Sequence, residues 1–300
     1  MHEAINNMAI LSIFTDRRPL DRKRTIIMKN YEEAGTHMIY QTILLFTLYS
    51  FLGWVSETVY CSVPAGKFIN RGFLNGPFCP VYGIGALLVV SFLKPFQSNI
   101  LLLFLCGIVV TSVLEYITAF LLEKMFHTKW WDYSEHKFNI HGRVCLLNSV
   151  LFGILSVFVM EILHPFLLSM LEHLPEWTVI GLTAGFSVYF IVDTVITVRS
   201  ILQLNEKLEK LHGMLDELTR HKEAYKEKLH NKLTDLDQET RAAAQQKINK
   251  LSAALEEFAQ NNKFSYQRLL QAFPHMKSIR HTEMLEKIKN AVKSKLQERK

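Results

Sequence analysis

The chain has 300 residues, of which 49% are hydrophobic and 21% are charged, and its formal net charge is +6 at pH 7. This mixture argues against one uniform water-soluble domain and indicates a membrane domain joined to a charged soluble part. The four cysteines include no Cys-x-x-Cys pair, which argues against a disulfide scaffold and against structural zinc.

Residues 1–37 form a polar and strongly basic extension. With the five spans described next, a cytoplasmic C-terminus would put this extension outside the cell, which conflicts with the positive-inside rule. We expect either that translation begins at Met38 or that a sixth, interfacial element lies near residues 5–14.

Residues 38–198 form the predicted transmembrane domain, which contains five apolar runs. Four of them approach or exceed the roughly 20 residues that a helix needs to cross about 30 Å of hydrocarbon. The second is shorter and contains Pro80, Gly83 and Gly85, so it either spans or re-enters the membrane. Because backbone polar groups in lipid must be satisfied within their own segment, we predict an all-α polytopic membrane protein. The runs are residues 38–60, 78–93, 100–122, 144–163 and 177–198.

Two of the runs contain a glutamate and lead into similar loops. Glu57 lies in the first run and Glu115 in the third, and after each a basic loop ends in a Gly-x-x-Cys step. An even number of spans separates the copies, so they form a weak parallel two-fold repeat. A charge at the bilayer centre costs roughly 2.5–3.5 kcal/mol on insertion scales, so two at matching places indicate a site or a packing device.

Arginines stand where the chain re-enters the membrane after each glutamate: Arg71 follows Glu57, and Arg143 follows Glu115. Carboxylate–guanidinium pairing, within or across the copies, would offset part of the desolvation cost. Two interpretations stay open. The pairs are either a lock that holds two helical hairpins together or a polar pathway, serving as a solute vestibule or a proton relay.

The loops that carry these arginines also contain turn-forming residues. Proline and glycine there predict a turn followed by a helix start. A helix N-terminus near Gly76 or Gly142 would present free N–H groups as a cradle for an anion; alternatively, these residues only end and begin helices. The motif residues are Asn75, Gly76, Pro77, Cys79, Pro80, Tyr82 and Gly83 in the first copy, and Asn139 and Gly142 in the second.

An aromatic cluster follows the third run. Trp130, Trp131, Asp132 and Tyr133 suit an interfacial aromatic belt, or they form a dock for a partner ATPase. No pair of nearby ligand residues has the His-x-x-x-His spacing, so we predict no metal and no cofactor. Asp193, near the end of the fifth run, is expected to reach the lipid headgroups.

Residues 199–300 form a charged tail with helical periodicity. Apolar residues at alternating steps of three and four over 201–236 predict a coiled coil or helical hairpin and, through it, a homo-oligomer. The positive-inside rule places this tail and the loops 61–77 and 123–143 in the cytoplasm. The basic residues near the end are either solvated or rest on anionic headgroups, and we predict no nucleic-acid binding.

Three stretches together resemble a known family: residues 53–60, 70–83 and 130–143. They closely resemble the ABC-transporter type IV family, bacterial integral membrane proteins also called CmpB-like predicted permeases. The resemblance covers about residues 38–195. It implies a multi-pass protein of the bacterial cytoplasmic membrane that serves as the permease subunit of an ABC-type transporter.

The sequence lacks the motifs of a nucleotide-hydrolysing enzyme. No Gly-x-x-x-x-Gly-Lys-Ser/Thr segment occurs, so the chain is not its own P-loop ATPase, and transport would require a separate one. Gly-x-Ser-x-Gly and His-Glu-x-x-His are also missing from the sequence, and we predict that the protein is not an enzyme. The alternative function is a membrane-anchored scaffold that recruits or oligomerises partners through its tail.

Overall fold

The computed structural model describes residues 18–231, 264–274 and 276–279, with several further positions between 245 and 290. Within these ranges, side chains are described from residue 35 onward, except for 211, 214–231 and 264–267. The interfacial element expected near residues 5–14, and the side chains of the predicted seam beyond 213, lie outside the description.

Most of the described chain is helical, and four helical segments are long and apolar enough to cross a membrane. The predicted all-α polytopic class is therefore confirmed, with four such segments where five spans were expected. The four segments belong to α2 (Arg18–Ala65), to α4 (Ile100–Phe126), to α5 (Leu146–Phe158) with its continuations η2 (Val159–Leu163) and α6 (His164–Glu172), and to α7 (Glu176–Asn231).

The second apolar run forms only a short helix, α3 (Pro80–Leu93), which is followed by the 3₁₀ turn η1 (Lys94–Phe96). At about 1.5 Å per residue, the 14 residues of α3 span about 21 Å, less than the hydrocarbon thickness. The N–H of Cys79 donates to the carbonyl of Ser50, 2.9 Å away and halfway along the apolar part of α2. The loop 66–79 therefore re-enters the bundle, and α3 begins level with the middle of the apolar stretch of α2.

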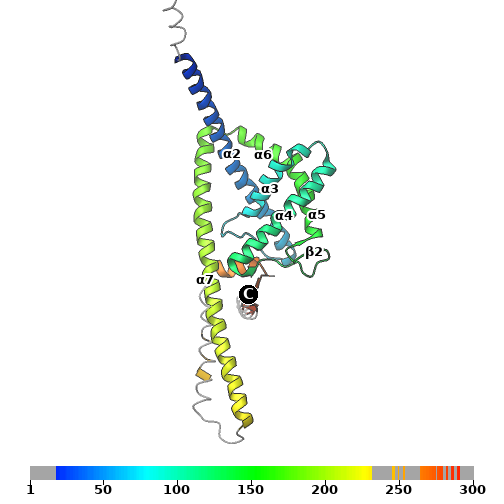
Figure 1. Cartoon of the computed structure of the whole chain (residues 1–300), viewed down its shortest axis with the longest axis vertical. Helices are drawn as coiled ribbons and strands as arrows, with labels where there is room; N and C mark the ends of the chain where they lie inside the picture. The colour runs from blue at the N-terminus through cyan, green and yellow to red at the C-terminus, as the bar shows by residue number, and fades with distance from the viewer. Residues whose placement is uncertain are drawn as a thin grey trace, which may run out of the picture.

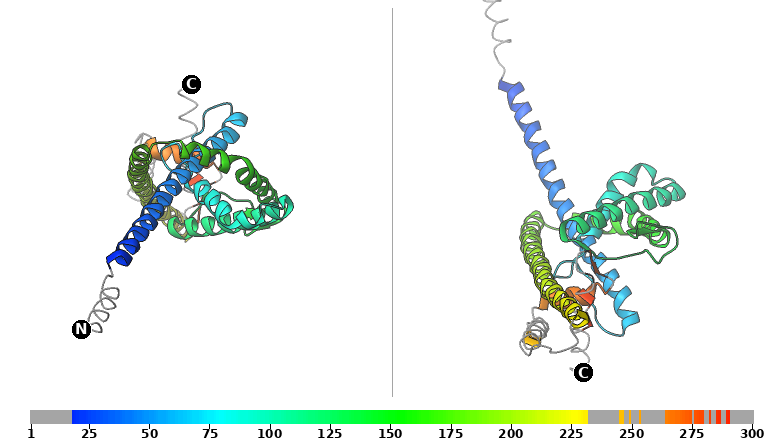
Figure 2. Two further views of the ribbon diagram at one scale, coloured as in Figure 1. Left: turned by 90° about the horizontal axis from the view of Figure 1, so that it is seen from above. Right: turned by 60° about the horizontal axis from the view of Figure 1, so that its bottom comes forward.

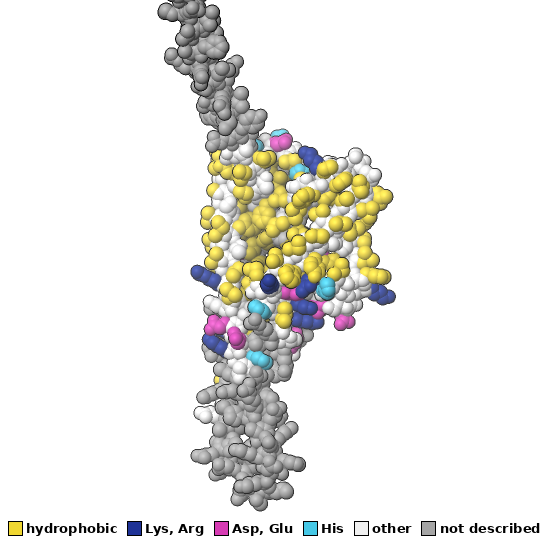
Figure 3. All heavy atoms as spheres, in the orientation of Figure 1, with side chains coloured by type: hydrophobic (Ala, Val, Ile, Leu, Met, Phe, Trp, Pro, Cys, Tyr) yellow, Lys and Arg dark blue, Asp and Glu magenta, His cyan; other side chains and the backbone are white. Residues whose placement is uncertain are grey.

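The helices pack against one another into a bundle. In Figure 1, α7 runs along one side of the bundle and continues below it, while α3, α4 and α5 lie on the other side. Figure 2 shows α2 entering the bundle obliquely and projecting beyond it at its N-terminal end. The apolar band in Figure 3 is bounded by charged side chains at both edges, as expected for a membrane-embedded surface. We call the face with the loops 66–79 and 127–145 the loop face.

The helix α7 passes through residue 198 without a break, so the predicted boundary between membrane domain and tail falls inside one helix. Farther along the chain, α9 (Phe264–Ala272) and β4 (Lys277–Ser278) return to the loop face. There β4 pairs antiparallel with β1 (Thr128–Lys129), placing Ser278 opposite Thr128. A second two-stranded pair, β2 (Asn139–Ile140) with β3 (Val144–Cys145), closes the same loop.

Two hydrophobic cores stabilise this arrangement. One lies within the membrane bundle between α2, α3, α4, η2, α6 and α7. The other lies on the loop face and joins Phe126 and Trp130 to α7 and to the C-terminal residues. Ile201, Leu204 and Leu208, the first apolar positions of the predicted seam, are buried in this second core. The coiled coil and the homo-oligomer through 201–236 remain predictions, since later side chains of the seam are not described.

The contact between α4 and α5 gives a direct test of the bundle. A Cβ at Gly107 would lie 2.7 Å from the Cβ of Ser156, whereas a Cβ at Gly181 would meet nothing within 4 Å. Gly107→Ala should therefore lower the free energy of unfolding by about 1–3 kcal/mol through overpacking. The matched variant Gly181→Ala should be neutral or stabilising, because alanine favours helix. Thermal unfolding in detergent would measure both, and equal effects would contradict this packing.

Candidate functional site

The re-entrant loop 66–79 is organised around the side chain of Asn70. Its Oδ1 accepts hydrogen bonds from Trp54 Nε1 at 2.7 Å and from the Gly72 N–H at 3.1 Å. Its Nδ2 donates to the Asn75 carbonyl at 3.1 Å. A non-helical segment at membrane depth is tolerated only when its polar groups form hydrogen bonds within the protein. Asn70 provides hydrogen-bond partners for two backbone groups of this loop.

Asp193 of α7 satisfies the tip of the same loop. Its carboxylate accepts from the backbone N–H groups of Asn75, at 3.0 Å, and Gly76, at 2.8 Å, and also from Asn75 Nδ2 at 3.1 Å. The Asp193 residue is only 6% exposed, and the hydroxyl groups of Tyr189 and Thr197 also lie within hydrogen-bonding distance. The expectation that Asp193 reaches the headgroups is wrong.

The N–H group of Gly76 thus does contact an anion, namely a carboxylate of the same chain. The helices themselves begin later, at Pro80 and at Leu146, and the preceding cysteines, Cys79 and Cys145, are their N-caps. The Gly-x-x-Cys step therefore ends in the same structural position in both copies. Pro77 lies in the loop, whereas Tyr82 and Gly83 lie in the first turn of α3.

Glu57 of α2 lies beside this loop and has two partners. The Tyr82 hydroxyl donates to its carboxylate at 2.5 Å, and Arg71 Nε lies 3.5 Å from its other oxygen. The structure therefore brings Glu57 and Arg71 together, as the sequence predicts. Glu57 is only partly buried, so this pair lies at the edge of the bundle that faces the loops.

Glu115 of α4 is partly buried, and its carboxylate interacts electrostatically with Tyr133 and, more weakly, with Glu57. One of its oxygens, Oε2, is inaccessible to solvent and has no hydrogen-bond partner among the described residues. The two glutamates of the sequence repeat therefore interact through their charges. We call Glu57, Arg71, Tyr82, Glu115 and Tyr133 the glutamate site.

Arg143 does not belong to this site, so the predicted pairing of Arg143 with Glu115 is wrong. Its guanidinium binds Glu123, with Nε at 3.1 Å and Nη2 at 2.5 Å from Oε2, and donates to the Tyr116 hydroxyl at 3.1 Å. The reason is that α4 continues to Phe126, about three helical turns beyond Glu115, and so presents Glu123 nearer to the loop. This ion pair, together with Tyr116, raises the pKa of Arg143.

The loop 127–145 is folded by its own polar residues. Gly142 has a φ of 70° and accepts a hydrogen bond from the Tyr133 N–H at 2.7 Å, while its own N–H donates to Asn139 Oδ1 at 3.0 Å. Asp132 accepts from Lys277 Nζ at 2.7 Å and from Ser134, and these hydrogen bonds hold the pKa of Asp132 well below its usual range. One end of the loop is thereby tied to β4.

Trp130, predicted as part of a dock, already has a partner within the chain. It is 4% exposed and packs edge-to-face on Phe73 and Phe273, with ring centroids 5.1 and 5.0 Å away. Trp131 donates to the carbonyl of Arg143 at 2.9 Å. Docking of a separate ATPase at these residues remains a prediction, and it would compete with the C-terminal segment.

Two arginines, one from the re-entrant loop and one from α9, each donate hydrogen bonds to the other segment. Arg71 donates to the carbonyl of Ala272, the last residue of α9, and its guanidinium carbon lies 4.9 Å from the centre of the Phe273 ring. Arg268 of α9 donates to the carbonyls of Gly72 at 2.6 Å and Phe73 at 3.0 Å. Burial lowers the pKa of Arg268 to about 10, so it stays charged at neutral pH.

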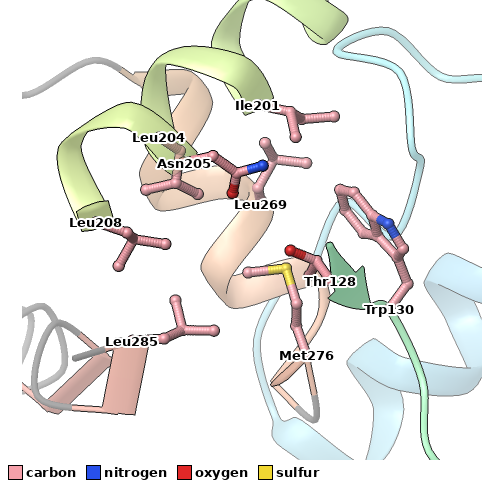
Figure 4. A pocket seen from close by; sticks show the side chains of 9 residues that line it. All are labelled: Thr128, Trp130, Ile201, Leu204, Asn205, Leu208, Leu269, Met276 and Leu285. Carbon is pink, nitrogen blue, oxygen red and sulfur yellow. The ribbon is translucent and has the colours of Figure 1, made fainter. Parts of the chain in front are cut away.

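Two hollows in the described structure lie away from the glutamate site. A cavity of about 10 Å³, just large enough for one water molecule, lies between α7, α9 and β1 (Figure 4). A hollow of about 690 Å³ lies between α4 and the α5–η2 segment and is lined by apolar side chains and Glu161. Neither includes Glu57 or Glu115. Among the described residues, no group of three His, Cys, Asp or Glu side chains is placed to hold a metal ion.

These features define a multi-pass helical membrane protein with a re-entrant loop and a covered polar site. Residues 44–198 match the model of the family described as "Putative ABC-transporter type IV". The match covers more than half of the chain, so the chain belongs to this family. Comparison with curated proteins and with solved structures gives no match. The matched region ends at Val198 and therefore contains neither α9 nor β4.

Sequence reasoning missed three functional contacts: the clamp by Asp193, the Glu123 pair of Arg143 and the Arg268 contact. The acidic residues Glu123 and Asp193 are visible in the sequence, Glu123 near the end of α4 and Asp193 within α7. Their partners lie in loops whose fold the spacing does not reveal. Arg268 stands in a run of tail residues with no motif to distinguish it.

The Asp193 clamp can be tested by one substitution. Asp193→Asn replaces one acceptor oxygen by a donor that faces the N–H groups of Asn75 and Gly76. We expect a loss of about 1–3 kcal/mol of stability, the cost of leaving buried polar groups unsatisfied. Glu161→Gln, at an exposed carboxylate of the lipid-facing hollow, is the control and should have little effect. Thermal unfolding in detergent measures both, and equal melting temperatures would contradict the clamp.

Gly76 gives an independent test of the same turn. A Cβ there would lie 1.6 Å from the Tyr189 hydroxyl oxygen, so Gly76→Ala should lower the melting temperature. Tyr189→Phe removes that oxygen and leaves the ring carbon, which would lie 2.9 Å from the new Cβ. The double variant should therefore recover part of the loss. Strict additivity of the two substitutions would show that they do not touch.

Proposed function

We propose that the protein is the membrane subunit of an ABC-type transporter, in which the glutamate site forms part of the pathway. The observation that carries the proposal is a cluster of ionisable side chains inside a bundle of this family: Glu57 contacts Arg71, and the charge of Glu115 interacts with that of Glu57. Ionisable side chains are expensive within a membrane and commonly mark the path of a solute or proton. Irregular backbone beside a short helix is likewise typical of transporter sites.

A separate ATPase follows from the same proposal. The sequence contains no P-loop, so ATP hydrolysis has to come from another chain. The loop face would lie in the cytoplasm, because its loops and the tail carry most of the Lys and Arg. The membrane would then be the cytoplasmic membrane of a bacterium, and the ATPase would act from the side to which α7 projects.

The arrangement of the site corresponds to a closed conformation. Glu57 is engaged by Tyr82 and Arg71, and Glu115 is covered by Tyr133. Transport would require these contacts to open toward the loop face, since Arg71 and Tyr133, which interact with the two carboxylates, belong to the loops 66–79 and 127–145. The same cluster would thus act as a lock when it is closed and as part of a pathway when it is open.

Two substitutions distinguish a pathway from a purely structural lock. Glu57→Gln removes the ion pair with Arg71 and should lower both stability and abundance. Glu115→Gln loses no arginine partner, so abundance and melting temperature should stay near those of the unmodified protein while activity is lost. Immunoblotting of membranes and thermal unfolding measure the first two quantities. A large loss of folded protein in Glu115→Gln would favour the lock.

The test of the proposed function is purification of the full chain from native membranes in mild detergent, followed by mass spectrometry of its partners. A P-loop ATPase in stoichiometric amount, with ATP hydrolysis that falls in Glu115→Gln, is the expected result. Self-association alone, or soluble partners bound only through the tail, would overturn it.

A membrane-anchored scaffold is the second candidate function. The observation that favours it is the continuity of α7, which extends as one helix from the bundle to Asn231 and so presents a long surface outside the membrane. In a scaffold, binding of partners would depend on residues 199–300 and not on Glu115. Partner binding that survives Glu115→Gln but disappears with substitutions in the seam would select this alternative.

A further inference from the structure

We propose that α9, β4 and the described residues between them form a displaceable cover whose release exposes the glutamate site to water. This inference concerns access to the site and does not depend on whether the site transports a solute. We call this segment the C-terminal cover.

The cover bridges the two loops that lie over the glutamate site. Through Arg268 it binds the carbonyls of Gly72 and Phe73 in the re-entrant loop. Through β4 and Lys277 it binds β1 and Asp132 in the other loop. The two loops belong to different helical hairpins, so the cover holds both hairpins in the closed arrangement.

Arg71 connects the cover directly to the site. The same guanidinium faces Glu57 on one side and the Ala272 carbonyl and the Phe273 ring on the other. When the cover leaves, Arg71 loses both of its partners in the cover and becomes accessible from the loop face. The environment of Glu57 therefore depends on whether the cover is bound.

The contacts of the cover suit reversible binding. Arg268 is 6% exposed, yet its described partners are neutral carbonyls, and its Nε has no hydrogen-bond partner among the described residues. Burying a guanidinium with an unsatisfied donor and no carboxylate partner opposes docking. The apolar contacts around Phe273 and Trp130 oppose release. The free energy of docking thus has two opposing contributions: the burial of Arg268 disfavours docking, and the apolar contacts favour it.

The position of the cover in the chain also suits reversible binding. The family match ends at Val198, so the cover lies outside the matched region. Residues 232–263 separate it from the end of α7. Because the cover and α7 belong to one chain, a released cover stays at a high effective concentration and rebinds without diffusing away.

Cys79 provides a built-in reporter of the covered state. It is 5% exposed, and its thiol is close enough to Glu57, Arg71 and Arg268 to interact with their charges. The experiment uses the full chain with Cys61, Cys106 and Cys145 replaced by serine, and measures the rate at which a water-soluble maleimide modifies Cys79 in detergent. Phe273→Ala, which removes a ring packed on Trp130 and Arg71, should raise this rate by roughly tenfold or more.

Two further variants make the result specific. Phe138→Ala, at an exposed phenylalanine of the loop 127–145, is the matched control and should label like the parent. Thr128→Cys with Ser278→Cys places a disulfide across directly opposed positions of β1 and β4, where the spacing of antiparallel strands suits one. Cys79 should be protected in the oxidised protein. After reduction and removal of the reductant, its labelling rate should return to that of the parent, with modification followed on the Cys79 peptide by mass spectrometry because the two reduced thiols also react.

Equal labelling of Cys79 in the oxidised and reduced forms would overturn the cover, whatever Phe273→Ala does. This comparison also decides the matter if Phe273→Ala proves unstable, because it uses one protein in two redox states. Protection on oxidation together with faster labelling in Phe273→Ala supports the cover. Neither result requires a transport assay, so failure of the proposed transport function would leave the cover standing.

Discussion

The structure depends on satisfying an irregular backbone inside a membrane-embedded bundle. The loop 66–79 reaches the level of Ser50 without helical hydrogen bonds of its own, and lipid offers none. Asn70 supplies partners from within the loop, and Asp193 supplies a carboxylate from α7. Because Asp193 comes from the last membrane helix, the first hairpin and α7 have to assemble together. Arg71 belongs to the same loop and lies beside Glu57 in this assembly.

The polar groups of the loop face form a connected series. Asp193 fixes the turn at Asn75 and Gly76, Arg71 joins this loop to Glu57, and Arg71 also reaches the end of α9. Glu115 and Tyr133 extend the series to the second hairpin. A change at the C-terminal segment therefore has a direct physical route to both glutamates.

The sequence repeat had a structural basis, but its two copies are not equivalent. In both copies the cysteine of the Gly-x-x-Cys step is the N-cap of a helix, and both glutamates reach one site. The arginines differ: Arg71 meets Glu57, whereas Arg143 binds Glu123. The difference arises because α4 extends farther past its glutamate than the sequence pattern suggests. The spacing of residues along a helix predicts which side chains share a face. It does not predict which acidic residue a long, flexible arginine side chain will bind.

The sequence by itself determined the class of the protein, the family, the apolar segments and the two glutamates, because hydropathy and local motifs depend on residues close together in the chain. Only the tertiary structure decided that the second run is a short helix after a re-entrant loop, that Asp193 clamps the loop and that Arg268 covers it. Those contacts join residues more than a hundred positions apart. Their partners are set by packing, which no local pattern encodes.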